Sequence, residues 1–267
     1  MNLKLGFTPG RFLVHEHQAP WKVVRAFHSP GGESLVHFHN VSGGILGGDS
    51  LALTMDVGVA AQVQVTSTSA TRVYRARDGA LPAQLSTHIT VAGGALLEYL
   101  PDPVIPFAGS RFEQRTSITL HESAGLFWWE TISCGREAAG ERFQFESLFS
   151  HTEIRAGRQL IAVEHWRLEP LRAPASSLVR MGPFLYSTVF YLCHPQGVSL
   201  EGALVKMAHE LSTAETRWGA SALVANGCVV RGLSMHSRFL AAGLISFWSM
   251  AKKTLYGREA ILPRKMY

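Results

Sequence analysis

The stretch Leu51-Ala-Leu-Thr-Met-Asp-Val57 alternates apolar residues with small or polar ones over its whole length. Successive side chains of a β-strand point to opposite faces of a sheet, so this period of two predicts a strand with one buried face. Similar alternation, or aromatic and β-branched runs bounded by turns, predicts further strands at 62–66, 125–132, 143–149, 159–166 and 186–192. The stretch 221–230 contains Asn226-Gly227, which predicts a hairpin turn because a tight turn needs positive φ at both central residues. The chain is therefore predicted to be mainly β.

Only two segments have the period of a helix. Leu200, Leu204, Met207 and Leu211 form one apolar face, with Ser199 as the expected N-cap. The second segment, 235–255, is apolar over a wide arc, which predicts burial either in the core or against another protein. Its candidate contact residues are Phe239, Leu240, Leu244, Phe247 and Trp248. We find no internal repeat and no linker, so residues 1–267 are predicted to form a single domain.

Composition excludes several classes of protein. Of the 267 residues, 46% are hydrophobic and only 17% are charged, which excludes intrinsic disorder. The net charge is +5, but the basic residues are dispersed, so no nucleic-acid partner is expected. Three widely spaced cysteines without a C-x-x-C pair indicate neither a zinc knuckle nor a disulfide framework. The start does not resemble a signal peptide and no apolar run could span a bilayer, so we expect a cytoplasmic protein with no membrane partner.

A glycine-rich segment precedes the strand at 51–57. Gly43, Gly44, Gly47 and Gly48 have nearly the spacing of a phosphate-binding loop, but Asp49 occupies the position of the essential lysine. A strand rather than a helix follows, so no helix N-terminus is available to hold a phosphate. We therefore predict a structural turn formed by the four glycines, in which Asp49 either caps the turn or offers a carboxylate.

Two H-x-H pairs could present imidazoles to a metal ion. His15 and His17 form one pair, and His37 and His39 form the other. Residues i and i+2 of a strand share a face, and imidazole suits nickel or zinc. Two ligands alone make only a weak site, so His37 and His39 are a weak metal candidate and polar strand histidines are the simpler interpretation.

Three glutamates lie inside apolar runs: Glu98, Glu130 and Glu164. A buried carboxylate needs a cationic partner, a hydrogen-bond network, water or a metal ion. The candidate ion-pair partners are Arg72, Arg75, Arg136 and Arg167. The alternatives are a general acid/base pair or oxygen ligands along a polar path. Because no G-x-S-x-G, H-E-x-x-H or Cys-His pattern is present, no catalytic residues are predicted.

Several of these segments, in order along nearly the whole chain, resemble the urease accessory protein family UreD, also called UreH. The segments Gly-Gly-Ile-Leu-Gly-Gly-Asp-Ser, Val-Thr-Ser-Thr-Ser-Ala-Thr-Arg-Val-Tyr-Arg and Leu-Glu-Tyr-Leu-Pro-Asp-Pro-Val-Ile-Pro-Phe carry the resemblance at 43–50, 65–75 and 97–107. Ser-Cys-Gly-Arg-Glu-Ala-Ala-Gly-Glu-Arg-Phe at 133–143 is similar to a further family segment, as are 218–223, 229–233 and 262–265.

The resemblance implies a maturation scaffold rather than an enzyme. Members of the family have stacked, β-helix-like sheets with about two α-helices. They bind the urease apoprotein and the accessory protein UreF, which recruits the GTPase UreG, and they are thought to guide Ni²⁺ through an internal polar passage. Asp49, Thr71, Glu130 and Glu164 are the candidates for lining this passage, with nickel bound transiently and no cofactor held tightly. The apolar helix at 235–255 becomes a candidate for either the core or the UreF contact.

Two other functions remain open from the residues. A soluble nickel carrier would use the H-x-H pairs. A β-rich carbohydrate-active enzyme would place Glu130 and Glu164 across an open groove, because glycoside hydrolysis needs two facing carboxylates.

Overall fold

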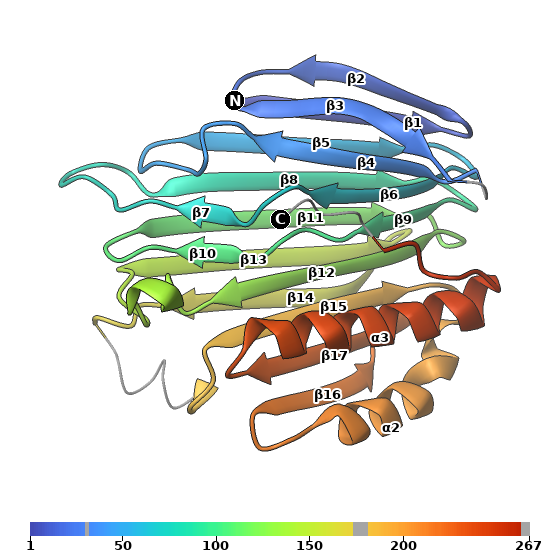
Figure 1. The fold of residues 1–267 in the computed structure, drawn as a ribbon. Helices are drawn as coiled ribbons and strands as arrows, with labels where there is room; N and C mark the ends of the chain where they lie inside the picture. The colour runs from blue at the N-terminus through green and yellow to red at the C-terminus, as the bar shows by residue number, and fades with distance from the viewer. Residues whose placement is uncertain (30–31, 173–180, 263–267) are drawn as a thin grey trace.

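Two β-sheets lie face to face in the computed structural model, which describes residues 1–29, 32–172 and 181–262 (Figure 1). Sheet A has the strand order β14-β13-β11-β8-β5-β1-β2, and sheet B has the order β16-β17-β15-β12-β9-β6-β4-β3. Sheet A contains β1 (Asn2–Thr8), β2 (Arg11–His17), β5 (Ser50–Val57), β8 (Ala83–Val91), β11 (Arg111–Leu120), β13 (Ser147–Ala156) and β14 (Gln159–Leu168). Sheet B contains β3 (Trp21–His28), β4 (Ser34–Asn40), β6 (Gln62–Ser67), β9 (Leu96–Tyr99), β12 (Gly125–Ser133), β15 (Tyr186–Cys193), β16 (Thr216–Ala222) and β17 (Gly227–Ser234). Two short strands extend it, since β10 (Val104–Pro106) pairs with β12 and β7 (Thr71–Val73) pairs with β10.

The middle of the chain winds as a flattened coil. From β4 to β13 the main strands alternate between the two sheets, and equivalent strands of successive turns pair in parallel. Antiparallel strands close both ends, with β2 and β3 at one end and β14 to β17 at the other. The predicted β-helix-like stack of sheets is confirmed.

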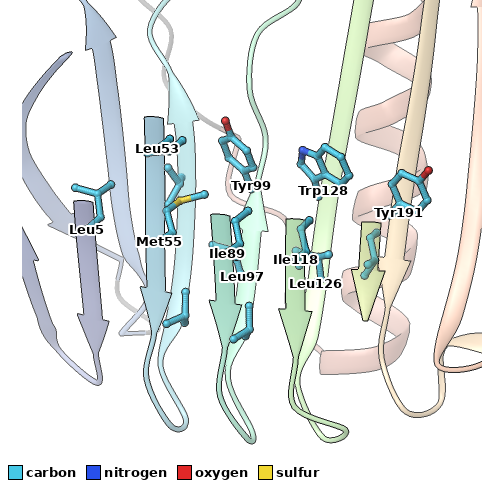
Figure 2. Packing of buried hydrophobic residues seen from close by; sticks show 14 of the residues in the cluster. Leu5, Leu53, Met55, Ile89, Leu97, Tyr99, Ile118, Leu126, Trp128 and Tyr191 are labelled. Atoms are coloured by element: carbon cyan, nitrogen blue, oxygen red, sulfur yellow. The ribbon is translucent and has the colours of Figure 1, made fainter. Parts of the chain in front are cut away.

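Apolar side chains fill the space between the sheets. On sheet A one line of residues in register crosses five parallel strands and consists of Leu5, Met55, Ile89, Ile118 and Ile154. Tyr99, Trp128 and Tyr191 of sheet B point into the same space (Figure 2). The stretch from Leu51 to Val57 buries every second residue, as its alternation predicts. Burial of this apolar area is the main favourable contribution to folding.

Two α-helices of the described chain, α2 (Glu201–Leu211) and α3 (Ser237–Tyr256), cover the outer face of sheet B (Figure 1). Leu240, Leu244, Phe247 and Trp248 are at most 3% exposed, and only Phe239 of the predicted contact residues is partly exposed. These four therefore belong to the core and not to a docking surface, because the outer face of sheet B is itself apolar and needs a cover. No helix among the described residues has the length and hydropathy needed to cross a membrane.

Local expectations fail at two positions. Ser199 is not the N-cap of α2, because a 3-10 turn, η2 (Gly197–Leu200), runs directly into the helix. The strand predicted from residue 143 begins only at Ser147, because Phe143 has a positive φ of 54° and its amide donates to the Cys134 carbonyl. The segment between β12 and β13 instead contains a short 3-10 turn, η1 (Glu137–Ala139).

Candidate functional site

Glu130 points from β12 into the space between the sheets, toward β11 and β13 of sheet A. Gln114 Nε2 and Ser150 Oγ donate to its carboxylate, the latter over 3.4 Å, and these two residues are neighbours in register. None of the ion pairs among the described residues includes Glu130. Burial, reinforced by the charge of Glu164, raises the pKa of Glu130 to about 7. Glu130 is therefore a carboxylate with neutral hydrogen-bond donors and, across the described ranges, no cation beside it.

Glu164, on the edge strand β14, is the second carboxylate of this site. It accepts hydrogen bonds from Trp166 Nε1 at 2.6 Å and from the Tyr191 hydroxyl, and it pairs with Arg231 Nη2 at 2.9 Å. Burial and the neighbouring Glu164 charge raise the pKa of Tyr191 well above its usual range, so its hydroxyl stays a donor. Among the described residues, three groups therefore hold Glu164, and Arg231 is the only cation of the three.

A line of buried hydroxyl groups leads to Glu164 across sheet A. Thr87, Thr116 and Thr152 lie in register on β8, β11 and β13, and Thr152 lies opposite Glu164. Apolar residues occupy the corresponding inward positions nearer the other end of the same strands. The interior is therefore polar on the side of the molecule where Glu130 and Glu164 lie.

A pocket of about 490 Å³ opens next to this polar interior, between β14 and the strands β15, β16 and β17. Glu164, Ser187, Arg217 and Arg231 are among the residues that line it, whereas Glu130 is not. Glu164 thus lies where the interior polar region meets the pocket, and Glu130 lies farther inside.

The structure does not bring Asp49 and Thr71 to this site. The Asp49 carboxylate accepts a hydrogen bond of 2.9 Å from the Leu46 amide, so it caps the glycine-rich turn. Thr71 begins β7, and its amide donates to the Pro103 carbonyl. No contact of the described residues joins either side chain to Glu130 or Glu164, so two of the four predicted passage residues converge and two lie elsewhere.

The predicted turn is present at 43–48. Gly43 and Gly48 have φ values of 79° and 88°, where glycine is favoured. A Cβ on Gly44 would lie 2.5 Å from the Tyr74 ring and 2.7 Å from the Arg72 carbonyl oxygen, so close packing excludes any side chain there. The turn leads into the strand β5 and not into the helix that a phosphate-binding loop requires.

The histidine pair His37 and His39 lies on β4, on the sheet face opposite the carboxylate site. Nδ1 of His39 is 2.7 Å from the Thr68 hydroxyl. Across residues 1–29, 32–172 and 181–262, no group of three His, Cys, Asp or Glu side chains is placed to hold a metal ion. His37 and His39 therefore have no third His, Cys, Asp or Glu ligand among these residues.

Glu98 belongs to a different cluster, on the outer face of sheet B under α3. Its carboxylate accepts hydrogen bonds from Trp248 Nε1 at 2.6 Å and Lys252 Nζ at 2.7 Å, and Lys252 also pairs with Glu33 at 3.0 Å. Burial raises the pKa of Glu98, and Lys252 opposes that shift.

The predicted ion pair of Glu98 is thus present, but with a lysine and not with one of the four candidate arginines. Glu164 likewise pairs with Arg231 and not with any of those four. In the sequence, the burial of Lys252 is indicated by its position, since it follows Trp248 by four residues and therefore lies on the same apolar face of the helix.

The coil of parallel strands, its helical cover and the interior carboxylate pair together define a β-helix-like protein with a polar region inside it. Residues 3–267 match the family model described as UreD urease accessory protein, and the chain belongs to this family.

Curated relatives agree over nearly the whole length. The chain is 41% identical over 263 residues to a urease accessory protein UreD of Herpetosiphon aurantiacus, covering 96% of this chain and 91% of that protein. It is 32% identical over 269 residues to urease accessory protein UreD 2 of Pseudomonas syringae pv. tomato, with 98% and 92% covered. A UreD of Pseudomonas aeruginosa is 32% identical over 257 residues, with 95% and 88% covered.

Proposed function

We propose that this chain is a cytoplasmic, non-enzymatic scaffold for urease maturation. It binds the urease apoprotein and UreF, and through UreF the GTPase UreG, and it passes Ni²⁺ toward the urease active site. Membership of the UreD family supports the role in maturation. The observation that carries the nickel step is the convergence of Glu130 and Glu164 inside the β framework, with none of the described cationic side chains next to Glu130.

The electrostatics of the pair favour a visiting cation. Two carboxylates in a region of low dielectric repel each other, which is why Glu164 contributes to the raised pKa of Glu130. A divalent ion between them removes this repulsion and displaces the proton that Glu130 holds near pH 7. The pair therefore stores unfavourable electrostatic energy that Ni²⁺ relieves.

The donor atoms of the site favour transfer over retention. Glu130, Glu164, Gln114 and Ser150 offer oxygen ligands, whereas imidazole and thiolate groups bind nickel more tightly. Weak, successive sites allow an ion to enter and to leave, as they do in ion channels. An oxygen-lined site of this kind is suited to passing the metal on.

The structure gives less support to the other two functions. A carbohydrate-active enzyme needs both carboxylates across one open groove, but Glu130 does not line the pocket that contains Glu164. A histidine-based nickel carrier would rely on His37 and His39, which have no third ligand among the described residues.

The test is urease activation in cells that carry the urease structural and accessory genes. Glu130→Gln and Glu164→Gln are compared with the control Glu153→Gln, which alters a partly exposed carboxylate on the outer face of β13. We expect both site variants to recover apo-urease and UreF in pull-downs but to lower the nickel content and activity of the urease about tenfold or more. The control should activate urease normally.

Two results would overturn the proposal. Capture of neither apo-urease nor UreF by the wild-type chain would contradict the scaffold. Full urease activation by Glu130→Gln and Glu164→Gln, each confirmed as folded, would contradict the nickel step.

A further inference from the structure

The pocket beside β14 has an excess of positive charge that the proposed nickel step does not use. Three arginines line it, Arg167, Arg217 and Arg231, against one carboxylate, Glu164. Arg167 is already paired with Glu169 at 2.7 Å, on the outer side of β14. Arg217 has no hydrogen-bond or ion-pair partner among the described residues. The pocket wall formed by β16 and β17 is therefore cationic, which favours an anionic ligand.

Arg217 and Arg231 are placed to act together. In the antiparallel pairing of β16 and β17, Gly219 lies opposite Arg231 and Arg217 lies opposite Leu233. The two arginines are thus diagonal neighbours on one face of the sheet, a separation of about 7–8 Å that long side chains bridge readily. Two guanidinium groups at this spacing can bind one carboxylate, because the N–H donors of each planar guanidinium fit the two carboxylate oxygens.

Carboxylate binding by the two arginines has a consequence for Glu164, because Arg231 is its only cationic partner in the part of the chain that the structure describes. The Arg231 side chain is 52% exposed, and an ion pair with so exposed a partner contributes little stability in water. A second carboxylate in the pocket can therefore draw the guanidinium away from Glu164. Glu164 would keep its bonds from Trp166 and Tyr191 but would carry an unbalanced charge next to Glu130.

We propose that this pocket is a carboxylate-binding site and that its occupation frees Glu164 to bind the cation. The ligand is either an acidic side chain of a partner protein or a small free carboxylate. The two binding events are then coupled, since each favours the state in which Arg231 has left Glu164. This inference rests on the proposed nickel role of Glu164, but carboxylate binding itself does not require it.

The first experiment detects binding without nickel. The indole N–H of Trp166 donates to Glu164, so its ¹H–¹⁵N resonance, assigned with Trp166→Phe, reports the release of Glu164. Propionate at constant ionic strength should shift this resonance in the wild-type chain. Arg217→Gln should weaken propionate binding about tenfold, whereas the matched control Arg115→Gln, an exposed arginine on the outer face of β11, should not. Equal propionate binding in the wild type and Arg217→Gln, or no binding at all, would overturn the proposal.

The second experiment measures the coupling by calorimetric titration with Ni²⁺. Saturating propionate should tighten nickel binding several-fold in the wild type, within the usual range of coupling between sites. Arg231→Gln should bind Ni²⁺ more tightly than the wild type without propionate, because Glu164 is already unpaired, and propionate should add nothing. Arg217→Gln should bind Ni²⁺ normally without propionate and show weakened coupling. If neither propionate nor the Arg231→Gln substitution changes the nickel affinity, the proposed coupling is overturned.

The source of the carboxylate is separated by a third arm. A blocked peptide containing one aspartate is titrated in parallel with propionate. Tighter binding of the peptide assigns the pocket to a protein partner, and equal or weaker binding assigns it to a free carboxylate. These measurements use the isolated chain. A negative result for carboxylate binding is therefore distinguishable from a failure of the proposed function, which is tested by urease activation with the Glu130 and Glu164 variants.

Discussion

Glu98 and Glu130 lie on opposite faces of sheet B, and of the two only Glu98 has a cation next to it among the residues that the structure describes. On the outer face, Lys252 and Trp248 bind the Glu98 carboxylate, and Lys252 also reaches Glu33. On the inner face, Glu130 receives hydrogen bonds from the neutral side chains of Gln114 and Ser150 and lies near a second carboxylate, Glu164. Burial raises the pKa of both glutamates.

The difference separates a structural role from a functional one. A buried charge that is paired and hydrogen-bonded links two elements of the fold. Here the ion pair between Lys252 and Glu98 links α3 to β9. A buried charge without a cationic partner weakens the fold unless something arrives to neutralise it. The following predictions test this contrast, beginning with the largest expected effect.

Removal of the lysine should destabilise the fold strongly. Lys252→Met keeps much of the side chain but leaves Glu98 and Glu33 buried without their shared cation. We expect the free energy of unfolding to fall by about 3–5 kcal/mol, measured with urea. Lys253→Met, on the exposed side of α3, should change it by less than about 0.5 kcal/mol. Adding Glu98→Gln to Lys252→Met should recover part of the loss, and a stable single variant would contradict the structural role.

The carboxylate pair should make stability depend on pH in the opposite sense to that of a salt-bridged acid. The pKa of Glu130 is about 7 in the folded chain and near the ordinary glutamate value of 4.5 when unfolded, so between these values the folded state binds more protons. Stability is therefore lost as the pH rises from about 4.5 to about 7, by about 3 kcal/mol for this group.

The control for this pH effect is Glu130→Gln, which has no proton to lose. Urea unfolding at pH 5.5 and pH 8 should show the wild type losing more stability than the variant over that interval. An equal loss in both would show that Glu130 does not titrate near neutrality.

Loss of the exposed partner of Glu164 should have the smallest effect. Arg231→Gln breaks an ion pair whose arginine is half-exposed, while Tyr191 and Trp166 still bind the carboxylate. We expect the unfolding free energy to fall by no more than about 1 kcal/mol. A loss close to that of Lys252→Met would place Arg231 among the structural ion pairs.

Much of the fold could be predicted from local pattern, because one-sided burial imposes a period of two. Leu51 to Val57 shows this rule on sheet A, whose outer face is open to water. Sheet B follows it less clearly, since β15 is buried on both faces under α3 and its residues from Val189 to Cys193 form a continuous apolar run. For the same reason the width of the apolar arc on α3 predicts burial but not whether a sheet or a partner protein covers it.

The site could be predicted only in part. Apolar neighbours mark Glu98, Glu130 and Glu164 as buried, but the choice of partner is a property of the tertiary fold. Lys252 is 154 residues from Glu98 along the chain, and Arg231 is 67 residues from Glu164. Asp49 shows the opposite case, in which the partner is local. Its carboxylate caps the glycine-rich turn that immediately precedes it, so the sequence around it is enough to predict this role.

X-ray absorption at the nickel edge tests most directly the claim that an uncompensated interior carboxylate pair receives the metal. Ni²⁺ is added in equal amounts to the wild-type chain, to Glu130→Gln/Glu164→Gln and to His37→Ala/His39→Ala. The account predicts a shell of oxygen ligands in the wild type and in the histidine variant, and loss of that bound nickel in the glutamine variant. A nitrogen-containing shell that disappears in the histidine variant and persists in the glutamine variant would contradict it.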